Sequence, residues 1–144
     1  MRYPLSFGTI EIITHNIAEV IVNEGVVMTL EIVQEYDNFL QQHFTQPFGL
    51  IINRINHYTY TFETKLHISS LENLKAGAII TYHVEGKKAI NDILQLRSHD
   101  NLNAKFFDGM DLGRKKAINW LMQELPLFSN VTQAGLQEEQ RNYS

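Results

Sequence analysis

The chain contains no cysteine, and this absence excludes disulfide bonds and thiolate chemistry. It also has no apolar run close to the roughly 20 residues that a membrane-spanning helix needs. The first residues, 1–5, contain neither a long apolar stretch nor a small-residue cleavage site, so we expect no secretory signal. These absences predict a cytoplasmic protein with no integral membrane segment.

Basic stripes and glycine-rich loops are missing as well. The formal net charge is −4, and the densest basic clusters are only 87–88 and 114–116, so we expect no nucleic-acid partner. The 8 glycines are scattered and form neither a phosphate-binding loop nor a Gly-x-Ser-x-Gly elbow. We therefore predict no catalytic residues. A length of 144 residues suits one domain with a real core.

Histidine is the one plentiful metal-ligating residue type, with 6 in the chain. No two of them have the His-x₃-His spacing that places both rings on one helix face. His57 and His83 are expected at the ends of neighbouring strands, where they can approach each other. A metal ion needs a third converging ligand, so we predict no metal site and no cofactor.

The apolar patterns predict the element order β-β-α-β-α-β-α-β-α. Segments 8–14 and 17–23 have the composition of an antiparallel strand pair, and the first of them is expected at the sheet edge. Helices are expected after the N-caps Thr29, Thr61 or Thr64, and Asp111, and over 85–96. The remaining strands are expected at 48–52, 78–82 and 103–107. Such crossovers make an α/β domain with a mostly parallel sheet, here residues 1–126, followed by a polar tail at 127–144.

Alternation within the strands suggests helices mainly on one face of the sheet. The other face would carry Ile21, Ile51, Ile79 and Phe107. That face is either a protein–protein surface or is covered in part by the tail and loops. In the last helix the predicted core side is Ile118, Leu121, Met122 and Leu125, with Trp120 partly buried beside it.

A polar segment follows the apolar strand at 48–52, where ligands dock in open α/β sheets. Its candidate binding residues are Asn53, Arg54, Asn56, His57, Tyr58 and Tyr60. Arginine offers a planar fork for carboxylate or phosphate, and tyrosine adds an aromatic wall. A recognition surface of this kind should be exposed. Alternatively, the asparagines hold the turn and Arg54 pairs with Glu24.

The element order, the Asn23-Glu24-Gly25 turn and the segment 48–56 resemble the STAS fold of anti-anti-sigma factors, in particular small bacterial SpoIIAA-like proteins. The resemblance covers residues 5–125. In the regulatory branch a phosphorylated Ser or Thr lies in an Asp-Ser-Ser/Thr-Gly-like turn after the third strand. Here the corresponding segment, 56–61, has no such motif, so we expect no phosphoswitch.

Two functions follow as hypotheses. The first is a non-enzymatic regulatory or interaction module that binds a protein partner or a second copy of itself. The second is a small-ligand or lipid-binding module with a pocket near Arg54, His57 and Tyr58. An apolar cavity beside Tyr58 and Phe62 favours a ligand, whereas a flat exposed patch favours a partner.

Overall fold

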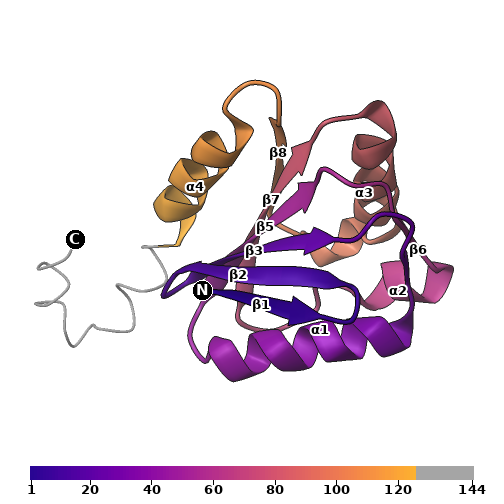
Figure 1. The fold of residues 1–144 in the computed structure, drawn as a ribbon, viewed down its shortest axis with the longest axis horizontal. Coiled ribbons are helices and arrows are strands. Elements are labelled where there is room, and N and C mark those ends of the chain that lie inside the picture. Colours follow the sequence, from indigo (N-terminus) through magenta and orange to yellow (C-terminus); the bar gives the residue numbers. More distant parts are fainter. Residues whose placement is uncertain (126–144) are drawn as a thin grey trace, which may run out of the picture.

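A six-stranded mixed sheet separates two helical layers (Figure 1). The computed structural model describes residues 1–125, and the predicted tail at 127–144 lies outside them. In spatial order the strands are β1 (Arg2–Leu5), β2 (Gly8–Thr14), β3 (Ile17–Val22), β5 (Phe48–Arg54), β7 (Leu74–Thr81) and β8 (Ala104–Asp108). From β3 to β8 the strands are parallel, while β1 and β2 are antiparallel additions. The predicted α/β class is confirmed, but β1, not the segment 8–14, is the edge strand.

Three helices cover one face of the sheet and a fourth covers the other. They are α1 (Leu30–His43), α2 (Phe62–His67), α3 (Val84–Leu96) and α4 (Gly113–Glu124). Figure 1 shows α4 on the side of the sheet away from α1, α2 and α3. Two short strands, β4 (Val27–Met28) and β6 (Thr59–Tyr60), pair with each other, and a 3₁₀ turn η1 (Ser98–Asp100) follows α3.

Side-chain caps begin two of the helices as the sequence predicts. Thr29 accepts a hydrogen bond from the Ile32 amide at 3.2 Å, and Thr61 caps α2 in the same way. Asp111 does not cap α4, which starts two residues later at Gly113. A Cβ on Gly113 would lie 2.5 Å from the Asp108 carbonyl oxygen, so the tight turn places glycine there and fixes the helix start.

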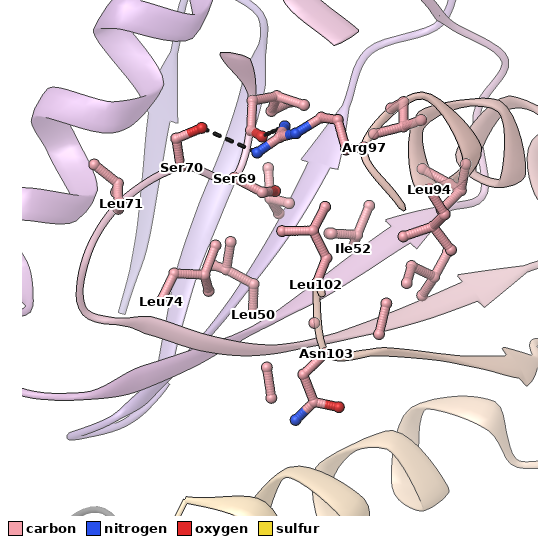
Figure 2. Close-up of a pocket in the computed structure, with 18 of the residues that line it drawn as sticks. Leu50, Ile52, Ser69, Ser70, Leu71, Leu74, Leu94, Arg97, Leu102 and Asn103 are labelled. Carbon is pink, nitrogen blue, oxygen red and sulfur yellow. Dashed lines mark hydrogen bonds between the residues drawn. The ribbon is translucent and has the colours of Figure 1, made fainter. Parts of the chain in front are cut away.

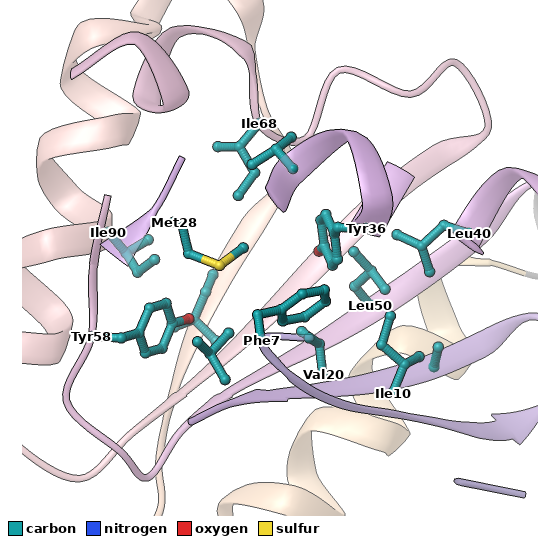
Figure 3. Packing of buried hydrophobic residues seen from close by; sticks show 14 of the residues in the cluster. Phe7, Ile10, Val20, Met28, Tyr36, Leu40, Leu50, Tyr58, Ile68 and Ile90 are labelled. Atoms are coloured by element: carbon teal, nitrogen blue, oxygen red, sulfur yellow. The ribbon is translucent and has the colours of Figure 1, made fainter. Parts of the chain in front are cut away.

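The larger core lies between the sheet and helices α1 to α3 (Figure 3). Its fully buried side chains include Phe7, Ile10, Leu40, Phe48 and Leu50. Phe44 and Phe48 stack with ring centroids 4.5 Å apart at the turn between α1 and β5. Burial of each large apolar side chain stabilises the fold by about 1.5–3 kcal/mol.

The second core lies beneath α4, and it overturns the prediction of a half-apolar open face. Ile51 is fully buried there against Ala117, Leu121 and Leu125. Ile79 is on the opposite face, because the parallel register pairs Ile51 with Ala78 and shifts Ile79 by one residue. The predicted protein–protein surface at these residues is therefore wrong.

The side chains of α4 divide as predicted, with one exception. Trp120 is partly buried and lies against Phe107 with ring centroids 5.9 Å apart. Met122 was expected in the core but is 52% exposed. Leu121 and Leu125 are buried as predicted, together with Ala117.

Asp37 on α1 should make stability depend on pH. One of its carboxylate oxygens is buried without a hydrogen-bond partner among residues 1–125, and burial raises the pKa of the carboxyl group from 3.8 to about 6. The folded state therefore binds the proton more tightly than the unfolded state, and the free energy of unfolding falls as pH rises from 3.8 to about 6. We expect Asp37→Asn to remove this fall and to be the more stable protein at neutral pH. Urea melts across this range test it, and an unchanged slope in the variant contradicts it.

Candidate functional site

Most of the polar residues after β5 are buried. Asn53, Arg54 and Tyr58 are 8%, 3% and 6% exposed, so the exposure expected of Arg54 and Tyr58 is wrong. His57 is exposed, and Asn56 and Tyr60 are partly buried. The strand does not end at 52 but continues to Arg54, which carries these side chains into the protein.

Both asparagine side chains donate hydrogen bonds to residues of β3. Asn53 donates to the Glu19 carboxylate at 2.8 Å on the α4 side of the sheet. Asn56 donates to the Val22 carbonyl at 3.0 Å and holds the turn after β5 against β3. Asn56 lines a shallow pocket together with Arg54, His57 and Tyr58, as predicted. Asn53 lies apart from them, on the α4 side of the sheet.

Arg54 is buried without a carboxylate partner among residues 1–125. Its guanidinium donates to the Tyr60 hydroxyl at 3.0 Å and to the Tyr58 carbonyl at 2.9 Å. The guanidinium carbon lies 3.9 Å from the centroid of the Tyr58 ring, a cation–π contact. Nε is buried and has no hydrogen-bond partner. The predicted pairing of Arg54 with Glu24 is wrong.

Glu24 binds the exposed His57 instead. Its carboxylate accepts from the His57 amide at 3.0 Å and lies 3.6 Å from the ring Nδ1. The His57 and His83 rings stack with centroids 4.6 Å apart, so the predicted approach of the two histidines is confirmed. The two histidines line a shallow pocket of about 350 Å³, which Arg54 lines as well. Among the described residues no group of three metal-ligating side chains converges.

A larger cavity of about 510 Å³ lies between the sheet and helices α1, α2 and α3 (Figure 2). Its walls are mainly apolar, and its polar groups gather at two ends. Tyr36, Tyr58 and Tyr60 line one end. Ser70, Arg97 and Asn103 line the other, near the amino ends of β7 and β8. The apolar wall includes Val20, Met28, Leu50, Ile52, Leu74, Ile79, Ile90, Ile93 and Leu102.

Small residues in the strands leave this space open. Gly77 lies within β7, and the nearest heavy atom to a Cβ built on it is Ile52 Cδ1, 3.8 Å away. Ala104, one strand over in register with Gly77, also lines the cavity. The sequence signal was a glycine in the middle of a strand, which typically marks close approach of another group. The sequence analysis placed Gly77 before the strand and therefore did not predict the cavity.

The tyrosines form a cluster of hydroxyls at the inner end. The Tyr58 and Tyr60 oxygens are 3.2 Å apart. Figure 3 shows Tyr58 and Tyr36 among the apolar side chains around Met28. Burial, followed by the neighbouring tyrosine charge, raises the pKa of both Tyr36 and Tyr58. These phenols therefore remain neutral hydrogen-bond donors at neutral pH.

Arg97 holds the outer end of the cavity together. It is 7% exposed and binds the Asp100 carboxylate at 2.8 Å, the Ser70 hydroxyl at 3.0 Å and the Ile68 carbonyl. These bonds join the end of α3 to the loop between α2 and β7. Because its charge is paired with Asp100 and each of its three nitrogens already donates a hydrogen bond, Arg97 positions the mouth of the cavity.

The fold and the cavity define an α/β protein with an internal, mostly apolar pocket. Comparison with known proteins finds no matching family model, no matching curated sequence and no matching solved structure. Within residues 1–125 every helix is too short or too polar to cross a membrane.

Proposed function

We propose that the protein is a non-enzymatic module that binds a small, largely apolar ligand in the cavity beneath α2 and α3. The observation that carries this proposal is the cavity itself. Its volume of about 510 Å³ falls within the range of roughly 300–1,000 Å³ typical of ligand sites. An apolar cavity beside Tyr58 is also the feature that separates the ligand hypothesis from the partner hypothesis. Phe62 lies outside it and is 61% exposed.

The chemistry of the lining supports binding without catalysis. No histidine lines the cavity, and its one acid among the described lining residues, Asp100, is paired with Arg97. The hydroxyls of Tyr36 and Tyr58 are held neutral by burial. A general acid–base pair needs two groups whose proton affinities are set apart near neutral pH, and this lining lacks such a pair.

Fewer observations support the hypothesis of a protein partner. The sheet face that it relied on is covered by α4, and Arg54 and Tyr58 are buried. The STAS-like resemblance still supports a bacterial cytoplasmic regulator in which ligand occupancy is read by a partner protein or a second copy. Ligand binding is the first step of that proposal and the part that the cavity supports.

Filling the cavity should abolish binding. Gly77→Val adds an isopropyl group at a strand position where a Cβ has room, and valine is favoured in strands. We expect the full chain to bind the uncharged fluorescent probe N-phenylnaphthylamine, and the variant to bind it at least tenfold more weakly. Its free energy of unfolding should be unchanged or higher, because the valine fills empty space.

Lys105→Val is the matched control, since it introduces the same side chain on the neighbouring strand but at an exposed position outside the cavity lining. It should bind the probe as the natural chain does. Failure of the natural chain to bind any apolar probe, or undiminished binding by Gly77→Val, would overturn the proposed function.

A further inference from the structure

The tyrosine cluster retains donors that no described residue uses. The Tyr60 oxygen accepts from Arg54, and one hydroxyl hydrogen is shared between Tyr58 and Tyr60. Tyr36 lines the cavity, and its hydroxyl makes no hydrogen bond to a described residue. Two of the three hydroxyl hydrogens are therefore without an acceptor among the described residues. This end of the cavity is suited to a ligand atom that accepts hydrogen bonds, because each phenol hydroxyl can donate one.

The charge at this end also lacks a counterpart. Arg54 is 3% exposed, and among residues 1–125 it has no carboxylate partner and donates only to the Tyr60 hydroxyl and the Tyr58 carbonyl. A buried cation is costly unless an anion lies nearby. Arg97, the other buried arginine beside the cavity, has Asp100. Arg54 thus places an uncompensated positive charge directly behind the tyrosine hydroxyls.

The rest of the cavity suits an apolar body. From the tyrosines at the carboxyl end of β5 the apolar lining continues past Met28, Leu50 and Ile79 to Leu74 and Leu102. The mouth lies at Ser70 and Asn103, which are exposed (Figure 2). A ligand that fills the space therefore meets apolar walls along its length and hydroxyl donors only at its inner end.

We propose that the ligand is an amphiphile with a carboxylate head, and that the head accepts hydrogen bonds from Tyr36 and from the Tyr58–Tyr60 pair. Arg54 does not touch the head. It donates to Tyr60 and so polarises the hydroxyls that do. This inference rests on the proposed function, since it names the class of ligand that the same cavity takes.

Head-group preference tests the inference. We expect the full chain to bind decanoate at least tenfold more tightly than decyltrimethylammonium, measured by displacement of N-phenylnaphthylamine. Charge-assisted hydrogen bonds are strong enough to produce a difference of this size. Tyr36→Phe should weaken decanoate binding about tenfold and leave decyltrimethylammonium binding unchanged.

Tyr36→Phe should fold normally, because the hydroxyl that it removes makes no hydrogen bond to any residue that the structure describes. Tyr3→Phe makes the same change on β1, outside the cavity, and should leave both affinities unchanged. Equal binding of the two probes would overturn the carboxylate inference while the proposed function stands. A decanoate preference that survives both Tyr36→Phe and Tyr58→Phe would overturn the placement of the head. Absence of binding by all probes would overturn the proposed function itself.

Discussion

Replacing Arg97 with alanine should lower the free energy of unfolding by about 3 kcal/mol. The side chain joins three parts of the chain through Asp100, Ser70 and the Ile68 carbonyl. Removing it leaves a buried carbonyl without its donor and opens the outer end of the cavity. Because ligand binding depends on that end, affinity for N-phenylnaphthylamine should fall as well. Urea denaturation measures the first effect and probe titration the second.

The Arg97→Lys variant separates the contribution of the positive charge to stability from that of the planar guanidinium group. Lysine keeps the positive charge but cannot reach a carboxylate, a hydroxyl and a carbonyl at once with a planar fork. We therefore expect it to recover less than half of the lost stability. Arg2→Ala is the control, because its ion pair with Glu11 is exposed and should be worth less than about 1 kcal/mol. An Arg97→Ala variant as stable as Arg2→Ala would show that the mouth is held by packing alone.

The sequence predicted the elements whose causes are local. The N-caps Thr29 and Thr61 and the alternating segment of β2 follow from neighbouring residues, so the helices and most strands appear where expected. The short strands β1, β4 and β6 escaped prediction. β4 and β6 are defined by pairing with each other and β1 by pairing with the adjacent β2, and the residues of these short strands carry too little pattern of their own.

Which face a residue occupies was harder to predict. A shift of one residue in register exchanges the two faces of a strand, so Ile79 was assigned to the face of Ile51 although the two lie on opposite sides. No local signal placed α4 on the second face. That helix is what buries Ile51 and Glu19 and removes the predicted partner surface.

In the candidate site, too, the sequence predicted the features with local causes and missed those set by tertiary packing. The sequence located the right end of β5, and Tyr58 and Tyr60 do line the cavity. It predicted exposure for Arg54 as part of a recognition surface. The helical spacing of apolar residues placed Tyr36 only on the apolar side of a helix, and Gly77 was placed just before a strand. Their role depends on empty space between elements that are far apart in sequence, and a sequence pattern does not report empty space.

The second large effect on stability is expected at the ion pair between Glu19 and Arg114 beneath α4. The Glu19 carboxylate is 4% exposed and accepts from Asn53 and from Arg114 Nε, both at 2.8 Å. Arg114→Met removes the only cation bonded to it among the described residues at this distance, and the charge stays buried. We expect a loss of about 3 kcal/mol in the free energy of unfolding, at the lower end for buried pairs because the Arg114 side chain is 48% exposed.

Removing the charge as well should restore much of that loss. In the double variant Glu19→Gln, Arg114→Met the neutral side chain still accepts from Asn53, so at least half of the stability should return in urea melts. Lys116→Met is the control on the same helix. Its ion pair with Asp111 is also 2.8 Å long but exposed on both sides, and should contribute less than about 1 kcal/mol. A double variant no more stable than Arg114→Met would mean that the arginine stabilises α4 by packing against the sheet. Recovery of stability would show that the fold needs Arg114 because the Glu19 charge is buried. The Glu19–Arg114 ion pair would then be what holds the start of α4 against the sheet.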